Sequence, residues 1–145
     1  MRQKDKELLK RDLCARLPYG VKVLCLRDFN HTWYKLEMVD IGDNEVYLTT
    51  NESYANRYVE IDVVKPYLIP LSKMTEEQLF EVQEILGKNE IKIEDGFLSI
   101  VDSDRNTISY LEILALLEWF YKNHFDIYGL IQMGLANDAT GLNIY

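Results

Sequence analysis

The last third of the sequence opens on the stretch that decides the fold, residues 108–121 (ISYLEILALLEWFY). Residues 124–131 (HFDIYGLI) continue it, and residues 134–145 (GLANDATGLNIY) close the sequence with a single charged side chain. Apolar side chains gain free energy by leaving water. We therefore expect the closing stretch to pack as part of the fold interior.

The stretch 108–121 is apolar nearly all round, whereas an ordinary surface helix has one apolar stripe. Two explanations are open. The favoured one is a central helix over residues 108–123, covered by a sheet and other helices. The alternative is that one of its faces binds another copy of the chain, which makes the protein a homo-oligomer.

Toward the beginning of the chain, the apolar spacing first fits a helix and then fits strands. Leu9, Leu13 and Leu17 recur every four residues and predict a helix over residues 4–17. Alternating apolar and polar side chains then predict strands near residues 21–26, 34–38, 46–49 and 59–63, joined as an antiparallel meander. We expect the stretch bracketed by Pro66 and Pro70 to leave the sheet, and we expect Lys65 to be extended because it precedes proline.

Three further elements are expected between residue 72 and the end. Thr75 and Gln78 form a capping box for a helix that buries Leu79, Val82 and Leu86 and ends at Gly87. Residues 91–93 and 97–101 flank an Asp-Gly turn and predict a hairpin. Asp126 is expected to cap a last short helix that ends at Gly134.

These patterns predict one α+β domain over residues 1–145. Residues 1–71 would form an N-terminal helix and a small, strongly bent antiparallel sheet of the kind found in Src-homology-like barrels. Residues 72–145 would be mainly helical, with one short hairpin.

Charge is spread unevenly along this acidic chain, whose net charge is -8. Residues 1–16 carry +3, residues 17–71 carry -3 and residues 72–145 carry -8. An acidic body repels phosphate backbones, which argues against general nucleic-acid binding. The first residues lead into an amphipathic segment, and no apolar run is long enough to span a bilayer, so we expect a cytoplasmic protein with no membrane contact.

The segment 102–106 (DSDRN) resembles the beginning of a calcium-binding loop. Asp102 and Asp104 would supply oxygen ligands, and Glu112 would supply the closing carboxylate. Thr107 replaces the glycine that such a loop requires, and Glu112 comes one position early. The favoured interpretation is therefore a capping box of Ser109 with Glu112.

His124 and Asp126 form a second candidate site, either an acid/base pair or two metal ligands. No third ligand is placed by the sequence, and zinc needs three or four. The favoured interpretation is that His124 ends the long helix and Asp126 caps the next one. No cofactor is expected.

Aromatic side chains gather in the predicted sheet. The candidates for a recognition face that binds a peptide or an extended ligand are Trp33, Tyr34, Tyr47, Tyr54, Tyr58 and Tyr67. The alternative is that aromatic residues are simply favoured in strands.

Three stretches together resemble a family of short, functionally uncharacterised Bacteroidetes proteins that are often associated with prophages and mobile elements. They are residues 12–21 (DLCARLPYGV), residues 65–77 (KPYLIPLSKMTEE) and residues 123–131 (NHFDIYGLI) with GLA at 134–136. Leu71 and Tyr128 depart from the family pattern. The resemblance implies a bacterial or phage origin and a cytosolic accessory protein.

The expected function is therefore non-enzymatic binding to an unknown protein partner, as an accessory protein of a phage or mobile element. One alternative is a metal-dependent enzyme that uses Asp102, Asp104 and Glu112. Another is an acidic decoy that mimics DNA, because residues 72–145 carry -8.

Overall fold

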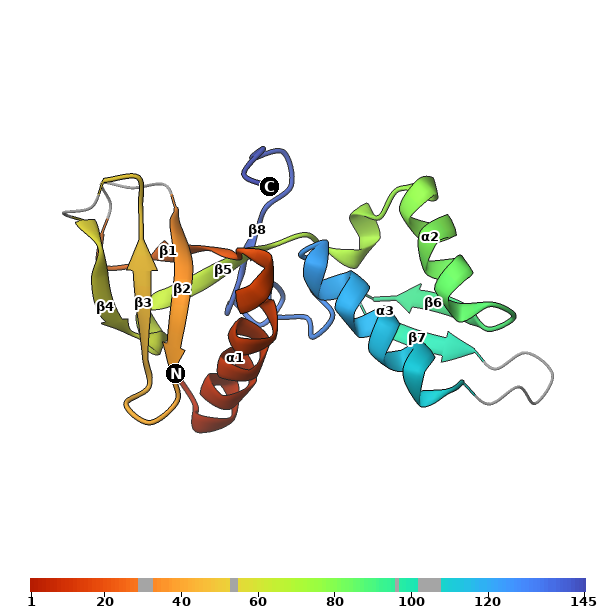
Figure 1. Ribbon diagram of the computed structural model, residues 1–145, viewed down its shortest axis with the longest axis horizontal. Helices are drawn as coiled ribbons and strands as arrows, with labels where there is room; N and C mark the ends of the chain where they lie inside the picture. The colour runs from red at the N-terminus through yellow and green to blue at the C-terminus, as the bar shows by residue number, and fades with distance from the viewer. Residues whose placement is uncertain (29–32, 53–54, 96, 102–107) are drawn as a thin grey trace. The chain divides into compact units, whose positions relative to one another are not determined.

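The computed structural model describes residues 1–28, 33–52, 55–95, 97–101 and 108–145. The chain forms two compact units (Figure 1). Unit 1 consists of Met1–Leu68 and Leu130–Tyr145, and unit 2 consists of Ile69–Gly129. The expected division after residue 71 is close to the first boundary. It misses the second boundary, because residues 130–145 belong with the sheet.

Unit 1 is a helix and a mixed six-stranded sheet. Its elements are α1 (Gln3–Arg16), β1 (Lys22–Cys25), β2 (Tyr34–Asp40), β3 (Glu45–Thr49), β4 (Arg57–Glu60), β5 (Val64–Leu68) and β8 (Asn137–Asp138). The strand order is β4-β3-β2-β1-β5-β8, with β5 and β8 parallel and the other neighbours antiparallel. The expected meander of β1 to β4 is confirmed. The sheet is not closed, however, so the closed barrel form is not supported.

Strand β5 corrects the expectation that the stretch from Pro66 to Pro70 leaves the sheet, whereas Lys65 is extended as expected. Pro66 lies inside β5, opposite Val23 of β1. On the other side of β5, β8 pairs only with Tyr67 and Leu68. Proline is tolerated in a strand where a neighbour does not need its missing N–H group. Pro66 lies in the part of β5 that β8 does not pair with, so β8 does not need an N–H group at this position.

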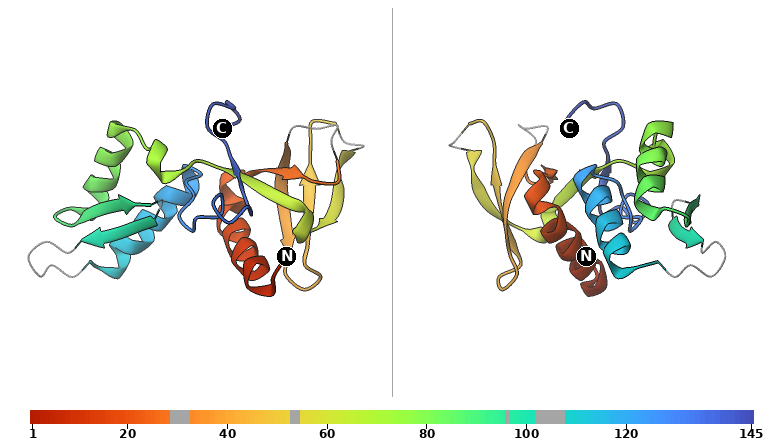
Figure 2. Two further views of the ribbon diagram at one scale, coloured as in Figure 1. Left: turned by 180° about the vertical axis from the view of Figure 1, so that it is seen from behind. Right: turned by 45° about the vertical axis from the view of Figure 1, so that its right-hand side comes forward.

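The core of unit 1 lies between α1 and one face of the sheet (Figure 2). Leu9 and Leu13 of α1 are fully buried, together with Val23 and Leu36 of the sheet. Asp12 and Arg16 are also fully buried on α1, and the Arg16 Nε atom lies 2.8 Å from Asp12 Oδ2. This helix therefore packs a charged pair against the core as well as its leucines.

The last part of the closing stretch, from residue 127 onward, is packed, as expected, but it is not helical. Leu130, Leu135 and Ala139 are buried, and the Ala139 amide donates to the Leu68 carbonyl at 2.8 Å. The expected helix that Asp126 would cap is wrong, because residues 127–136 form turns and bends. Gly129 has a φ of 70°, in the left-handed region, which interrupts a right-handed helix.

Unit 2 combines two α-helices, a hairpin and a short 3-10 turn in its described part. Its elements are η4 (Leu71–Lys73), α2 (Glu76–Leu86), β6 (Glu90–Glu94), β7 (Phe97–Val101) and α3 (Tyr110–Lys122). Both expected capping boxes, Thr75 with Gln78 and Ser109 with Glu112, are confirmed. A mainly helical 72–145 half is not supported, because the hairpin and the irregular closing stretch make up much of it.

Unit 2 begins and ends on one backbone bridge. Ile69 and Phe125 pair in parallel. The Ile69 amide donates to the His124 carbonyl, and the Asp126 amide donates to the Ile69 carbonyl, both at 2.9 Å. The two ends of this unit are therefore held side by side.

The apolar helix α3 is buried on one side only. Leu116 and Phe120 lie in the core with Val82 and Leu86 of α2. The favoured expectation of a fully covered central helix is therefore wrong for the opposite side, where Leu111 is 76% exposed. Leu79, expected in the stripe of α2, is also exposed, because Val82 and Leu86 define the face that α2 turns to the core.

Candidate functional site

The strands β1, β2 and β5 present a mixed aromatic and basic surface on the side of the sheet away from the core. Strand side chains alternate between the two faces. In β1, Val23 and Cys25 point to the core, so Lys22 and Leu24 point away from it. Lys22 is paired in register with Lys35, and Leu24 with Lys65. We call the six residues Lys22, Leu24, Trp33, Lys35, Lys65 and Tyr67 the outer β1–β5 face.

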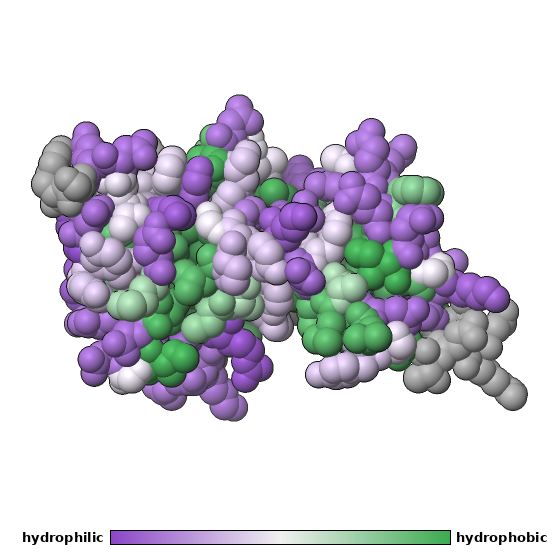
Figure 3. Space-filling view, in the orientation of Figure 1, coloured by the Kyte–Doolittle hydropathy of each residue, from purple (hydrophilic) through white to green (hydrophobic). Residues whose placement is uncertain are grey.

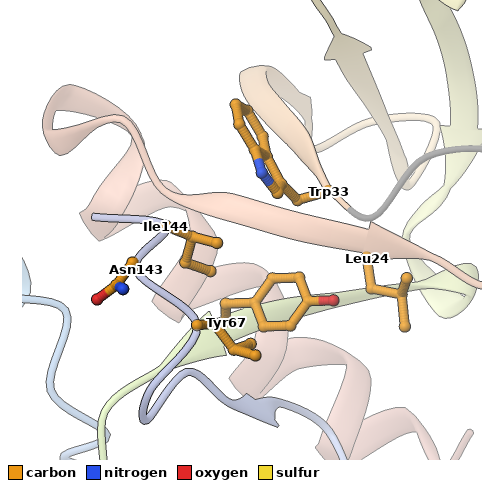
Figure 4. Close-up of a pocket in the computed structure, with 6 residues that line it drawn as sticks. Leu24, Trp33, Tyr67, Asn143 and Ile144 are labelled. Carbon is orange, nitrogen blue, oxygen red and sulfur yellow. The ribbon is translucent and has the colours of Figure 1, made fainter.

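This face holds a pocket of about 450 Å³ (Figure 4). The pocket is lined by Leu24, Trp33, Tyr67, Leu142, Asn143 and Ile144. Its walls thus come from the sheet and from a segment more than seventy positions further along the chain. Its volume falls in the range of pockets that bind small ligands or single large side chains.

Residues 142–145, the 142–145 segment, are attached to the sheet by polar contacts. The Tyr145 hydroxyl donates to the Tyr67 carbonyl at 2.7 Å and accepts from the Lys22 amide at 3.0 Å. The Lys22 ammonium donates to the Ile144 carbonyl and lies 3.9 Å from the centroid of the Trp33 ring. Lys22 therefore connects the segment to the aromatic wall of the pocket through a cation–π contact.

The tyrosines at this site stay neutral at physiological pH. Burial raises the pKa of Tyr145 to about 12, and it also raises the pKa of Tyr67. The formal charges on the outer β1–β5 face are those of its three lysines. Lys35 is paired with Glu37 at 2.7 Å in an exposed position. The surface is therefore apolar at the pocket, and the positive charge beside it that Glu37 does not balance is that of Lys22 and Lys65.

The aromatic residues predicted as a recognition face do not all lie on one surface, and Tyr54 is outside the described part of the chain. Trp33 lines the pocket, but Tyr34 is fully buried and its hydroxyl donates to Asp28. Arg57 pairs with the same carboxylate at 2.9 Å. Burial, with a smaller contribution from the bond to Asp28, raises the pKa of Tyr34 to about 12. Tyr34 is therefore a core residue, because β2 turns it inward next to Leu36.

Tyr47 and Tyr58 form a separate aromatic pair on β3 and β4. Their ring centroids are 4.7 Å apart, in directly paired positions of the two strands. Met38 of β2 is paired with Tyr47 on the other side. This short cross-strand row stabilises the sheet by side-chain contact.

The candidate metal ligands are not brought together in the described residues. Asp102 and Asp104 lie outside the described part of the chain, and the Glu112 carboxylate accepts from the Ser109 amide at 2.7 Å. Within the described ranges, no group of three or more His, Cys, Asp or Glu side chains could hold a metal ion.

His124 and Asp126 are buried at the end of α3. His124 has a φ of 59°, and its amide donates to the Tyr121 carbonyl, while the Phe125 amide donates to the Phe120 carbonyl. These two bonds are those of a Schellman motif, in which a left-handed residue ends the helix. His124 therefore ends the helix as expected, while Asp126 begins no helix.

Sequence patterns included Tyr67 among the aromatic residues of a possible recognition face, but they missed the 142–145 segment as part of a site. The alternation of Lys65 and Tyr67 with buried neighbours was a usable signal for a strand, but Pro66 between them argued against one.

None of the helices in the described ranges has the length and apolar character needed to cross a membrane. Comparisons with protein-family models, with curated proteins and with solved structures found no match.

Proposed function

We propose that the chain is a non-enzymatic binding protein that recognises an acidic segment of a partner protein through the outer β1–β5 face. The observation that supports this most directly is the pocket walled by Trp33 and Tyr67 with Lys22 at its edge. Pockets with apolar walls and a few placed polar groups are the usual form of a binding site.

The lining defines the side chain that the partner inserts. Leu24, Ile144 and the two aromatic rings offer dispersion contacts and no formal charge. A large apolar or aromatic side chain in this pocket would lose its hydration and stack against the rings. Such an anchor supplies most of the binding energy in many protein interfaces.

The lysines define the residues next to that anchor. Within the described part of the chain, the Lys65 side chain makes no hydrogen bond or ion pair, and Lys65 is paired in register with Leu24. Unit 1 has eleven basic and twelve acidic side chains, whereas unit 2 has five and twelve. A positive face on the less acidic unit favours carboxylates on both sides of the anchor, which also speeds association.

The biological setting follows from the sequence resemblance alone. On that basis we propose a cytosolic accessory protein of a phage or mobile element. A second candidate function is the DNA-mimic decoy, which the net charge of -7 on unit 2 favours. A decoy would bind basic DNA-handling proteins through unit 2, with affinity that falls steeply with salt.

Selection from a random peptide library displayed on phage tests the binding site. We expect enriched peptides to share one aromatic or large aliphatic residue flanked by Asp or Glu. Binding of a synthetic consensus peptide should fall about five- to thirtyfold in the Trp33→Ala and Lys65→Glu variants, because each removes a contact worth about 1–2 kcal/mol. Lys92→Glu, an exposed lysine of unit 2, is the charge-matched control.

Three results would refute this proposal. One is a consensus without acidic residues, and another is binding that Lys65→Glu and Lys92→Glu weaken equally. The third is tight binding of a single-stranded oligonucleotide that Lys65→Glu abolishes, which would assign the face to nucleic acid. Loss of peptide binding in the wild-type chain at physiological salt, with retained binding to a basic protein, would favour the decoy.

A further inference from the structure

The first two turns of α3 expose an apolar surface that the core does not use. Tyr110 is 75% exposed, Leu111 76% and Leu114 46%, and Ile113 and Ala115 are exposed beside them. Figure 3 shows apolar side chains gathered over this helix. We call Tyr110, Leu111, Ile113, Leu114 and Ala115 the exposed α3 face. Contiguous apolar patches of this kind mark interaction sites.

We propose that a second copy of the chain occupies this face, with the two α3 helices packed antiparallel. Residues 110–117 contain one charged side chain, Glu112. Its carboxylate is bound to the Ser109 amide at the helix start. The apolar side chains of the face therefore carry no charge among them, and the exposed carboxylate beside them is that of Glu118, one turn after Leu114. Two such apolar surfaces can pack together without burying an unpaired charge if Glu118 stays at the edge of the contact.

Antiparallel packing also gives Glu118 a favourable position. If the two helices cross at Leu114, Glu118 of one copy lies opposite Tyr110 of the other, because both are four residues from the crossing point. The N-terminus of a helix carries a partial positive charge that stabilises a nearby carboxylate. Parallel packing would instead place the two Glu118 carboxylates together. The charge pattern therefore favours the antiparallel arrangement.

The size of the face indicates a weak dimer. Its exposed side chains offer on the order of 500 Å² per copy, or about 1,000 Å² in total, slightly below the usual range of stable interfaces. Unit 2 also carries a net charge of -7, so two copies repel each other at low ionic strength. Salt screens this repulsion and leaves apolar contacts intact. We therefore expect dimerisation to increase with salt.

Sedimentation velocity of the full chain tests the proposal, at several protein concentrations and at about 0.05 and 0.5 M salt. We expect a species of twice the 17.1 kDa chain mass that grows with both concentration and salt. The double variant Leu111→Glu/Leu114→Glu should be monomeric. Phe80→Glu, which changes an exposed apolar residue of α2, is the matched control and should dimerise normally. Circular dichroism checks that each variant is folded.

Cysteine cross-linking tests the direction of the helices. Under mild oxidation Leu114→Cys should form a disulfide-linked dimer, because this position meets its copy at the crossing point. Tyr110→Cys should not, because antiparallel packing places its two copies about 12 Å apart along the axis. The wild-type chain, with Cys14 and Cys25, gives the background.

Several outcomes would overturn the proposal. A monomer under all conditions would do so, and so would a dimer that survives Leu111→Glu/Leu114→Glu or that Phe80→Glu abolishes. A dimer that weakens with salt would indicate a contact between opposite charges. Equal cross-linking at both cysteine positions would indicate parallel helices.

Discussion

Replacing Asp12 by leucine should destabilise unit 1 far more than its position on a helix suggests. Asp12 and Arg16 have no exposed side-chain surface, and their pairing atoms lie 2.8 Å apart. Removal of one partner of a buried ion pair costs about 3–5 kcal/mol of unfolding free energy. The leucine removes the carboxylate and adds only apolar surface, so the loss measures mainly the missing attraction between Asp12 and the buried Arg16 guanidinium.

Urea unfolding followed by circular dichroism measures this effect. Asp12→Leu/Arg16→Met should recover most of the loss, because apolar side chains of similar volume can replace a buried ion pair at little cost. Glu37→Ala provides the control: its partner Lys35 lies closer, at 2.7 Å, but both side chains are exposed. The control should lose less than about 1 kcal/mol. The reasoning fails if Asp12→Leu costs no more than the control, or if the double variant is as unstable as the single one.

Three other changes should have readily measured effects. Tyr34 and Tyr145 have folded-state pKa values of about 12, above the ordinary 10, so the stability that they contribute is complete below pH 10 and is lost as the pH rises toward 12. Absorbance titration should show one late-ionising tyrosine fewer in Tyr145→Phe than in the wild-type chain; equal numbers in both would contradict the assignment. Leu116→Ala should cost about 2–5 kcal/mol in denaturant unfolding, because Leu116 lies in the core, whereas Leu111→Ala should change stability by less than about 0.5 kcal/mol; equal losses would refute this packing of α3. Ser109→Ala removes the capping bond to the Glu112 amide and should cost about 1 kcal/mol in thermal melts, and an unchanged melting temperature would contradict the cap.

Elements specified by neighbouring residues could be predicted from the sequence. The capping boxes at Thr75 and Ser109 depend on a partner three residues away, and the β6–β7 hairpin depends on a turn at Asp95. The meander from β1 to β4 joins strands that follow each other in the chain. In each case the stabilising interaction and its signal lie within one short window.

The candidate site could not be predicted, because it depends on distant pairings. The hydroxyl of Tyr145 bonds to the amide of Lys22, 123 positions earlier, and no local pattern encodes that contact. Pro66 concealed β5, since its acceptability depends on how far β8 extends along the neighbouring edge. The partial exposure of α3 was equally inaccessible, because apolar composition does not reveal how much partner surface the fold supplies.

The bridge between Ile69 and Phe125 makes unit 2 a closed insertion between two adjacent strands of unit 1. While unit 2 is folded, the connection from β5 to β8 behaves as a short, rigid link. Once it unfolds, the same connection becomes a flexible loop of about 70 residues, whose closure entropy costs roughly 3–4 kcal/mol. That penalty acts on β8 and on the residues after it, including Leu142 and Ile144 at the pocket. Damage to a hairpin or helix that contributes no lining atom should therefore loosen the ligand site through chain connectivity alone.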